Sequence, residues 1–175
     1  MLRFLLIAVA VIGLVVACVL ALAASKPARF TVKRSVTIQA PPERVLAFIN
    51  DLHRWPEWSV DTQDDPNIQR SYIGAAAGQG AVSLWDGKSG KMRLEIVESN
   101  PGLVRVQADW ERPFVARNIN VFALEPHGTG TQVTWSLDGQ NVFMLKVMTV
   151  LVSADKLMGS HLEKNLSALK AAAEK

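Results

Sequence analysis

The sequence has few residues that carry redox or metal chemistry. Its one cysteine, Cys18, lies in a hydrophobic stretch near the amino terminus, so residues 30–175 contain neither a disulfide nor a reactive thiol. The three histidines, His53, His127 and His161, are not at metal-ligand spacing, and we expect no metal site. The sequence also lacks a Ser–His–acid set, a glycine-rich phosphate loop and a nucleotide-binding motif. We therefore assign no catalytic residue and no cofactor.

Charged side chains are missing from residues 4–24, which have no strongly polar side chain either. As an α-helix this stretch spans about 30 Å, the thickness of the hydrocarbon core of a bilayer. A core helix of a soluble protein would carry a polar face, and this stretch has none. The sequence therefore predicts a transmembrane helix at residues 4–24, inside an N-terminal anchor formed by residues 1–25.

Two other fates of this segment are compatible with its sequence. Arg3 and the small residues Ala21 and Ala23 fit a cleaved signal peptide, although the apolar run exceeds the usual length of about 7–15 residues. Val15–Cys18 loosely resembles a lipobox, but more membrane-like sequence follows it. We expect a retained, single-pass anchor in a bacterial inner membrane. Basic residues on both sides of the segment leave the side of the soluble domain open.

After a short tether, residues 26–29, the remaining residues 30–175 have the length of one domain with its own core. The whole chain carries a formal net charge of +3, and part of the basic excess directly follows the hydrophobic segment. Basic residues in that position favour contact with lipid headgroups over contact with nucleic acid. We expect a membrane partner and no nucleic acid, and the sequence leaves the oligomeric state open.

The periodicity of the domain predicts a strand, two short helices, six strands and a long helix. Alternating apolar residues predict the first strand at residues 29–39, and Pro41–Glu43 predicts the start of a helix. Turn residues between the later strands predict an antiparallel meander. Those strands are expected at Ile68–Gly74, Gly80–Trp85, Lys91–Ser99, Val104–Trp110, Val115–Glu125 and Thr131–Leu137.

Apolar residues at steps of three and four predict one long C-terminal helix, with Asn141 as its cap and Gly159 as a point where it can bend. The predicted fold class is α+β: a bent antiparallel sheet of about seven strands wrapped around this helix. Such a sheet does not close tightly along the whole helix, so we expect a cavity between them. Residues Val142–Val152 are apolar nearly all round, which predicts either burial or contact with a membrane or a partner.

Several stretches resemble the START-like (SRPBCC) superfamily of polyketide cyclase/dehydrase and lipid-transport proteins. These stretches are Val36–Val45 with Asp51–Trp58, Gly80–Gly87, Leu124–Pro126 with Gly128–Trp135, Asp155–Gly159, and Leu166–Lys170. The resemblance begins at Phe30, runs to the C-terminus and leaves out the hydrophobic segment. It implies the helix-grip fold, in agreement with the predicted element order. It implies little about function, because members bind diverse ligands and a minority are enzymes.

Side chains on the inward faces of the predicted strands and helix are the candidate ligand contacts. Aromatic residues and methionines there either fill the core or line a pocket. Asp155 is a carboxylate on the apolar helical stripe, where it would orient a polar ligand group, transfer a proton or make a structural bond. Asn118 shares a strand face with two of the candidates, Asn120 and Phe122. The candidate ligand-binding residues are Trp58, Trp85, Met92, Trp110, Asn120, Phe122, Trp135, Met148, Asp155 and Met158.

Three functions are compatible with this sequence. The first is a membrane-anchored binding module for a hydrophobic small molecule, lipid-like or isoprenoid-like, held between the sheet and the C-terminal helix. The second is a cyclase- or dehydratase-type enzyme on an apolar substrate, which requires convergent polar groups in the pocket. The third is a cell-envelope interaction protein whose cavity is filled. The hydrophobic segment beside the domain favours the first.

Overall fold

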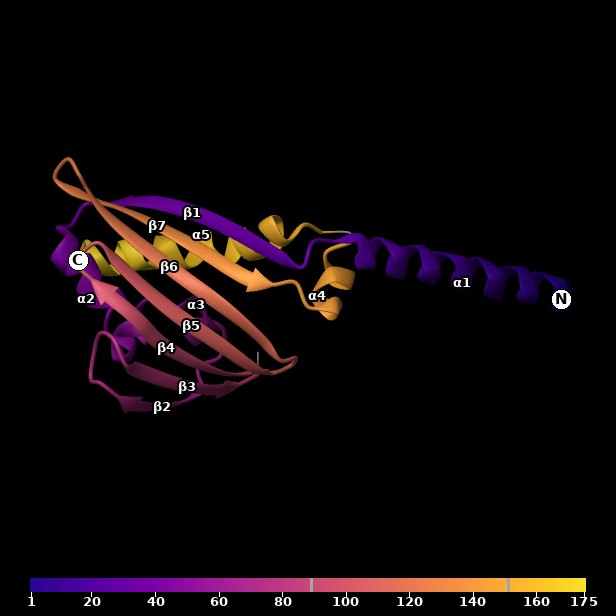
Figure 1. The fold of residues 1–175 in the computed structure, drawn as a ribbon, viewed down its shortest axis with the longest axis horizontal. Coiled ribbons are helices and arrows are strands. Elements are labelled where there is room, and N and C mark those ends of the chain that lie inside the picture. Colours follow the sequence, from indigo (N-terminus) through magenta and orange to yellow (C-terminus); the bar gives the residue numbers. More distant parts are fainter. Residues whose placement is uncertain (89, 151) are drawn as a thin grey trace.

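Seven antiparallel strands form a single bent sheet in the computed structural model, which describes residues 1–88, 90–150 and 152–175 (Figure 1). Their spatial order is β1-β7-β6-β5-β4-β3-β2. Each strand from β2 to β6 therefore pairs with the strand that follows it in the chain, as the turn residues predict, and β7 also pairs with β1. The strands are β1 (Arg29–Ile38), β2 (Gln69–Gly74), β3 (Ala81–Gly87), β4 (Gly90–Asn100), β5 (Leu103–Arg112), β6 (Ala116–His127) and β7 (Gly130–Gln140).

The long helix α5 crosses the concave face of this sheet, and two of the short helices contact it (Figure 1). Leu162, Leu166 and Leu169 of α5 are buried against the sheet, which gives the helix-grip arrangement that the sequence predicts. The helices are α1 (Leu2–Ser25), α2 (Pro42–Ile49), the 3-10 helix η1 (Leu52–Glu57), α3 (Val60–Asp64), α4 (Phe143–Met148) and α5 (Ala154–Ala173).

The C-terminal segment forms two helices, and the prediction of one continuous helix is wrong. At the end of α4, the Thr149 hydroxyl donates to the Leu145 carbonyl, and the Ser153 hydroxyl accepts the backbone N–H of Lys156 to cap α5. A serine in this position is a strong helix start signal. Asn141 does not cap α4 with its side chain, which donates instead to the Pro27 carbonyl.

The helix α5 continues through Gly159, where the sequence suggests that it can bend. Gly159 serves a different purpose, which is to leave room for a side chain from β1. A Cβ atom at this position would overlap the guanidinium group of Arg34. That guanidinium group donates to Asp155 and Glu163 and so joins β1 to α5. The glycine therefore permits a polar tie between the sheet and the helix that it grips.

The helix α1 extends away from the domain (Figure 1). Within the described residues, Arg3–Ser25 is the one helix long and apolar enough to cross a membrane, with a mean hydropathy of 3.2. This length and composition fit a membrane span and a signal sequence alike. Close to the domain, Ala23 in the last turn of α1 is fully buried, where α1 meets α4.

Candidate functional site

A cavity of about 400 Å³ lies between the concave face of the sheet, α5 and the short helices. Leu94, Ala108 and Leu137 come from three strands of the sheet, and Met158 and Leu162 come from α5. Side chains alternate across a strand, so the inward set of each strand reaches the same space. The predicted cavity between sheet and helix is therefore present, and its wall is mostly apolar.

Tryptophans form much of this wall, and most of their polar edges are already satisfied by the protein. The indole N–H of Trp85 donates to the Ser83 hydroxyl at 2.7 Å, and that of Trp135 donates to the Asn120 side-chain oxygen at 2.9 Å. Trp58 donates to the Phe48 carbonyl at 3.2 Å. With these bonds made, the rings present apolar surface to the cavity.

A cluster of four aromatic rings closes one side of the cavity. Trp58 meets Trp135 and Phe122 edge-on, with ring centroids 6.3 and 6.4 Å apart, and Trp55 meets Phe122 at 6.1 Å. Edge-to-face pairs at these distances are favourable beyond the area that they bury. Phe122 is fully buried inside this cluster and does not reach the cavity. Its predicted ligand contact is therefore corrected to a core position.

The side chain of Arg70 is partly buried and packs over the ring of Trp85. Its guanidinium carbon lies 4.6 Å from the centroid of the Trp85 ring, and its Nη2 donates to the Thr62 hydroxyl at 2.6 Å. Burial lowers the pKa of Arg70 from its ordinary value, against the opposing effect of nearby Tyr72. The cation–π contact and the tie to α3 hold the Trp85 wall in place.

Two asparagines on β6 place polar groups in the floor of the cavity. Asn120 is 8% exposed and lines the cavity, and because its side-chain oxygen accepts from Trp135, its amide NH₂ is available as a donor. Asn118 lies two residues earlier on the same face and also lines the cavity. A buried donor needs a partner, so these amides can bind an acceptor on a ligand.

A second polar group lies where α3 meets α5. The His161 Nε2 atom is 3.7 Å from the Asp61 carboxylate and 3.1 Å from the Asn165 side-chain nitrogen. Asn165 is buried, and its side-chain oxygen accepts the backbone N–H of Val60, which fixes α3 against α5. Asp61, His161 and Asn165 all line the cavity. Sequence patterns did not predict this set, because its members come from separate elements with no common motif.

Asp155 lies outside the cavity, contrary to its predicted place on the inward stripe. Its side chain is 64% exposed, and its carboxylate accepts from Arg34 at 2.9 Å. The hydrogen bond from Arg34 lowers the pKa of Asp155 below its ordinary value. The carboxylate thus makes a structural ion pair between α5 and β1, and an enzymatic role loses its main candidate residue.

Met148 is also outside the cavity, on the outer surface of α4. The break between α4 and α5 changes the helical phase, so residues before Thr149 do not share the inward face of α5. The alternative of burial for this apolar stretch is wrong for Phe143, Met144 and Met148, which are exposed. The remaining predicted ligand-binding residues all line the cavity, namely Trp58, Trp85, Met92, Trp110, Asn120, Trp135 and Met158.

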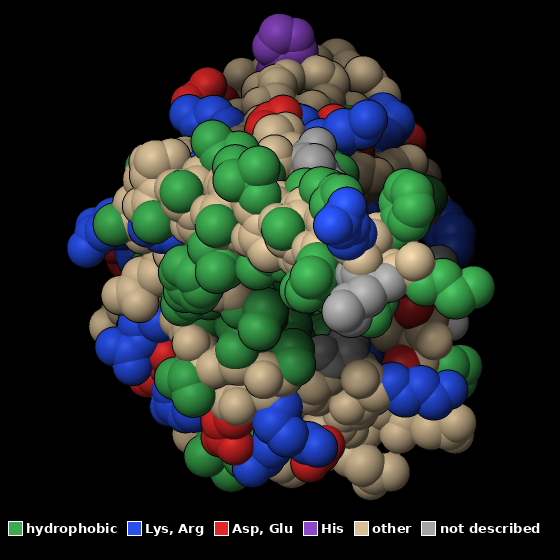
Figure 2. Space-filling model, turned by 90° about the vertical axis from the view of Figure 1, so that its right-hand side faces the viewer, with side chains coloured by type: hydrophobic (Ala, Val, Ile, Leu, Met, Phe, Trp, Pro, Cys, Tyr) green, Lys and Arg blue, Asp and Glu red, His purple; other side chains and the backbone are tan. Residues whose placement is uncertain are grey.

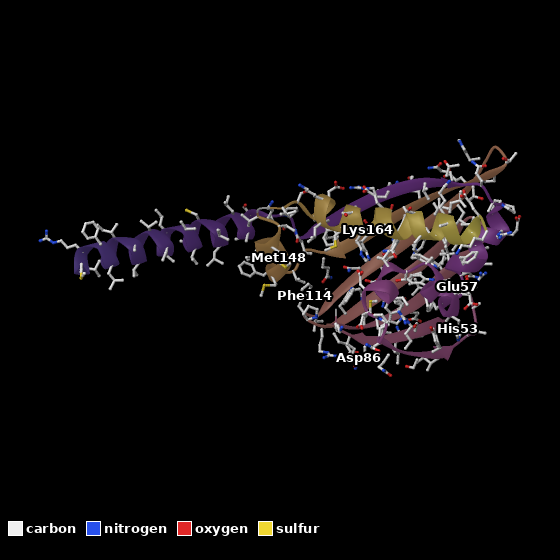
Figure 3. All side chains as sticks on the ribbon, turned by 180° about the vertical axis from the view of Figure 1, so that it is seen from behind. His53, Glu57, Asp86, Phe114, Met148 and Lys164 are labelled. Carbon is white, nitrogen blue, oxygen red and sulfur yellow. The ribbon has the colours of Figure 1, made fainter. Side chains whose placement is uncertain are left out.

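The end of the cavity nearest α1 is bordered by the β5–β6 loop and by α4. Pro113 and Phe114 of the loop, Leu145 of α4 and Phe30 of β1 line it there. Figure 2 views the molecule from this end and shows hydrophobic side chains around a recess. Figure 3 places Phe114 and Met148 close to where α1 leaves the domain, and His53 towards the opposite end.

A bent antiparallel sheet that encloses an apolar cavity with its C-terminal helix defines a helix-grip protein. The chain belongs to the polyketide cyclase/dehydrase and lipid-transport family, whose model matches residues 29–174. This match begins at β1 and so leaves out α1. Family membership establishes the fold of the domain but leaves its ligand unspecified, because one fold hosts many functions.

Solved structures of low sequence identity share the fold. Protein CV1439 from Chromobacterium violaceum is 16% identical with a TM-score of 0.61, over 83% of this chain and 97% of that one. The solved structure of Ara h 8.0201 is 13% identical with a TM-score of 0.56, over 83% of this chain and 95% of that one. DynU16, from the dynemicin biosynthetic locus, is 16% identical with a TM-score of 0.57, over 83% and 47%. No curated protein sequence matches the chain.

Proposed function

We propose that the protein is a membrane-anchored binding module for a hydrophobic small molecule of lipid-like or isoprenoid-like character. The observation that carries this proposal is the cavity of about 400 Å³, which the side chains of the protein do not fill. Its volume lies in the range of about 300–1,000 Å³ that small-molecule sites occupy. An interaction protein with a filled core would have no such space.

The lining specifies the ligand further. Walls of tryptophan, leucine and methionine favour an apolar body. The amides of Asn118 and Asn120 on one side and the Asp61–His161 pair on the other favour a ligand that carries at least one polar group. The apolar helix α1 supports a membrane source for such a molecule, because it can hold the domain at the bilayer.

An enzymatic function would have to use Asp61 and His161, the ionisable pair at the cavity. Their 3.7 Å separation is longer than a hydrogen bond, and Asn165 lies closer to the same histidine nitrogen. The pair therefore fits recognition of a polar ligand group better than proton transfer, and binding is the proposal that we retain.

Titration with the uncharged fluorophore 1-aminoanthracene tests the binding function. The full chain is held in an amphipathic polymer, because detergent can itself enter an apolar cavity. We expect a saturable rise in emission with a dissociation constant of about 1 μM, corresponding to about −8 kcal/mol. Farnesol should displace the probe, and glycerol should not. A linear, unsaturable signal, or no displacement by farnesol, would contradict the proposal.

A further inference from the structure

Four exposed hydrophobic side chains gather at the end of the domain from which α1 leaves. Val115 on the β5–β6 loop is 81% exposed, and Phe143, Met144 and Met148 on α4 are each more than half exposed. We refer to these four residues as the apolar collar. A contiguous exposed apolar surface on a folded domain marks a contact with something apolar. Figure 2 looks onto this end of the molecule, where hydrophobic side chains, including those of α1, face the viewer.

The part of the apolar collar that α4 carries is held against the base of α1. The backbone N–H and the side-chain amide of Asn141, just before α4, donate to the carbonyls of Ala28 and Pro27. From within α4, the Lys146 ammonium group donates to the Lys26 carbonyl at 2.8 Å. Together with the buried contact of Ala23 beside α4, these bonds fix α4 next to the last turn of α1.

This position sets the level of the apolar collar relative to a bilayer. α1 has 24 residues, which as a helix of about 1.5 Å per residue is slightly longer than the hydrocarbon core. When α1 spans the bilayer, its last turn lies at the boundary between acyl chains and headgroups. The apolar collar then lies at that same boundary, where exposed Phe and Met side chains are buried in lipid.

The two elements that carry the apolar collar, the β5–β6 loop and α4, also border the cavity. Phe114 and Leu145 line it, and they are direct neighbours in sequence of Val115 and Met144 in the apolar collar. An element that enters the lipid surface with its outer side chains thus presents its inner side chains to the cavity. The end of the cavity that this loop and α4 border therefore lies on the same side of the domain as the apolar collar.

We propose that the apolar collar inserts into the acyl-chain boundary of the bilayer, so that the cavity opens directly onto lipid. A hydrophobic ligand then enters from the membrane without crossing water. This inference rests on the membrane anchor of the proposed function, and it adds that the domain itself is a second membrane contact. The occupant of the collar is the lipid surface, because α1 brings the collar to that surface by a fixed connection.

Depth-dependent quenching of a fluorescent label tests this insertion. The full chain with Cys18→Ala and Met144→Cys carries a nitrobenzoxadiazole label and is reconstituted in phosphatidylcholine vesicles that contain a doxyl-labelled phospholipid. We expect its emission to fall by about half, as for a group buried about 5–10 Å into the interface. The matched control is Ile73→Cys in the same background, because Ile73 is equally apolar and 55% exposed but lies on the outer strand β2. Its label should remain unquenched.

The natural Cys18, labelled in the otherwise unchanged chain, separates this inference from the anchor proposal. Quenching at Cys18 and at Met144→Cys, but not at Ile73→Cys, supports the inference. Quenching at Cys18 alone overturns it and leaves the anchor intact, and the collar then faces water or a second copy of the chain. Failure to quench at Cys18 contradicts the anchor and the inference together. Equal quenching at Met144→Cys and Ile73→Cys overturns the inference, because the apolar collar would then contact lipid no more than the distant strand β2 does.

Discussion

Replacing Ala108 with phenylalanine is expected to weaken the binding of 1-aminoanthracene by about tenfold or more, which is about 1.4 kcal/mol of binding free energy. Ala108 lies in the floor of the cavity on β5, opposite Asn118 on β6. Its side chain points at the space between sheet and helix, so a larger ring there takes the volume that a ligand needs. Fluorescence titration of the full chain measures the change, and Ala108→Leu should give an intermediate loss.

The control for this variant is Ala171→Phe, because Ala171 is exposed on α5 and outside the cavity. It should bind the probe like the unchanged protein. The free energy of unfolding of Ala108→Phe should be unchanged or higher, since the added ring fills existing space and does not overpack a closed core. Undiminished probe affinity in a folded Ala108→Phe variant would show that the ligand binds elsewhere.

Replacing Trp58 with alanine is expected to lower the free energy of unfolding by about 3–5 kcal/mol. Trp58 is 1% exposed, and its ring contacts Trp55, Phe122 and Trp135. The substitution leaves a large void and also removes the donor to the Phe48 carbonyl. Because whole domains are stable by only about 5–15 kcal/mol, this single change is a large fraction of the total. Chemical denaturation followed by far-ultraviolet circular dichroism measures it.

Two further variants separate packing from hydrogen bonding at this position. Trp58→Phe keeps much of the aromatic contact and loses the bond to Phe48, so it should cost about 1–3 kcal/mol. Trp110→Ala removes a tryptophan that lines the cavity but is only half-buried, and it should cost less than Trp58→Ala. A loss below about 1 kcal/mol for Trp58→Ala would be inconsistent with a structural role for the aromatic cluster.

The sheet could be predicted from sequence because its signals are local. Alternation in Val104–Trp110 and Thr131–Leu137 corresponds to strands β5 and β7, whose apolar faces are buried. The direction of Trp85 could not be predicted in this way, since it shares its face with Ser83 and its other neighbours are apolar. The structure places both inward, because the Ser83 hydroxyl accepts the indole N–H of Trp85 and so is satisfied when buried.

The errors at Asp155 and Met148 have one physical origin. A helical stripe extended from Met144 to Leu169 assumes an unbroken phase, but α4 ends at Met148 and the separate helix α5 begins at Ala154. The sequence does contain the signal for a new helix, because Ser153 precedes Ala154 and Asp155 as a cap precedes a first turn. A helix that begins after Ser153 has Asp155 in its first turn, where the side chain is exposed.

The polar set of Asp61, His161 and Asn165 was beyond prediction for a different reason. Asp61 on α3 lies near His161 on α5, and Asn165 joins the two helices by accepting the backbone N–H of Val60. This contact depends on the packing of a five-residue helix whose sequence has little periodicity. Local patterns carry no information on such tertiary neighbours, whereas the cavity itself followed from the element order and the resemblance to a known family.

Native mass spectrometry of the full chain, released from the same amphipathic polymer, tests most directly whether the cavity holds a hydrophobic ligand. Our account predicts a population with the mass of the protein plus one lipid-sized molecule, bound without a covalent bond. The same adduct should be strongly reduced in Ala108→Phe and retained in Ala171→Phe. Detection of the bare protein alone, or of adducts that are equally abundant in all three proteins, would contradict the account.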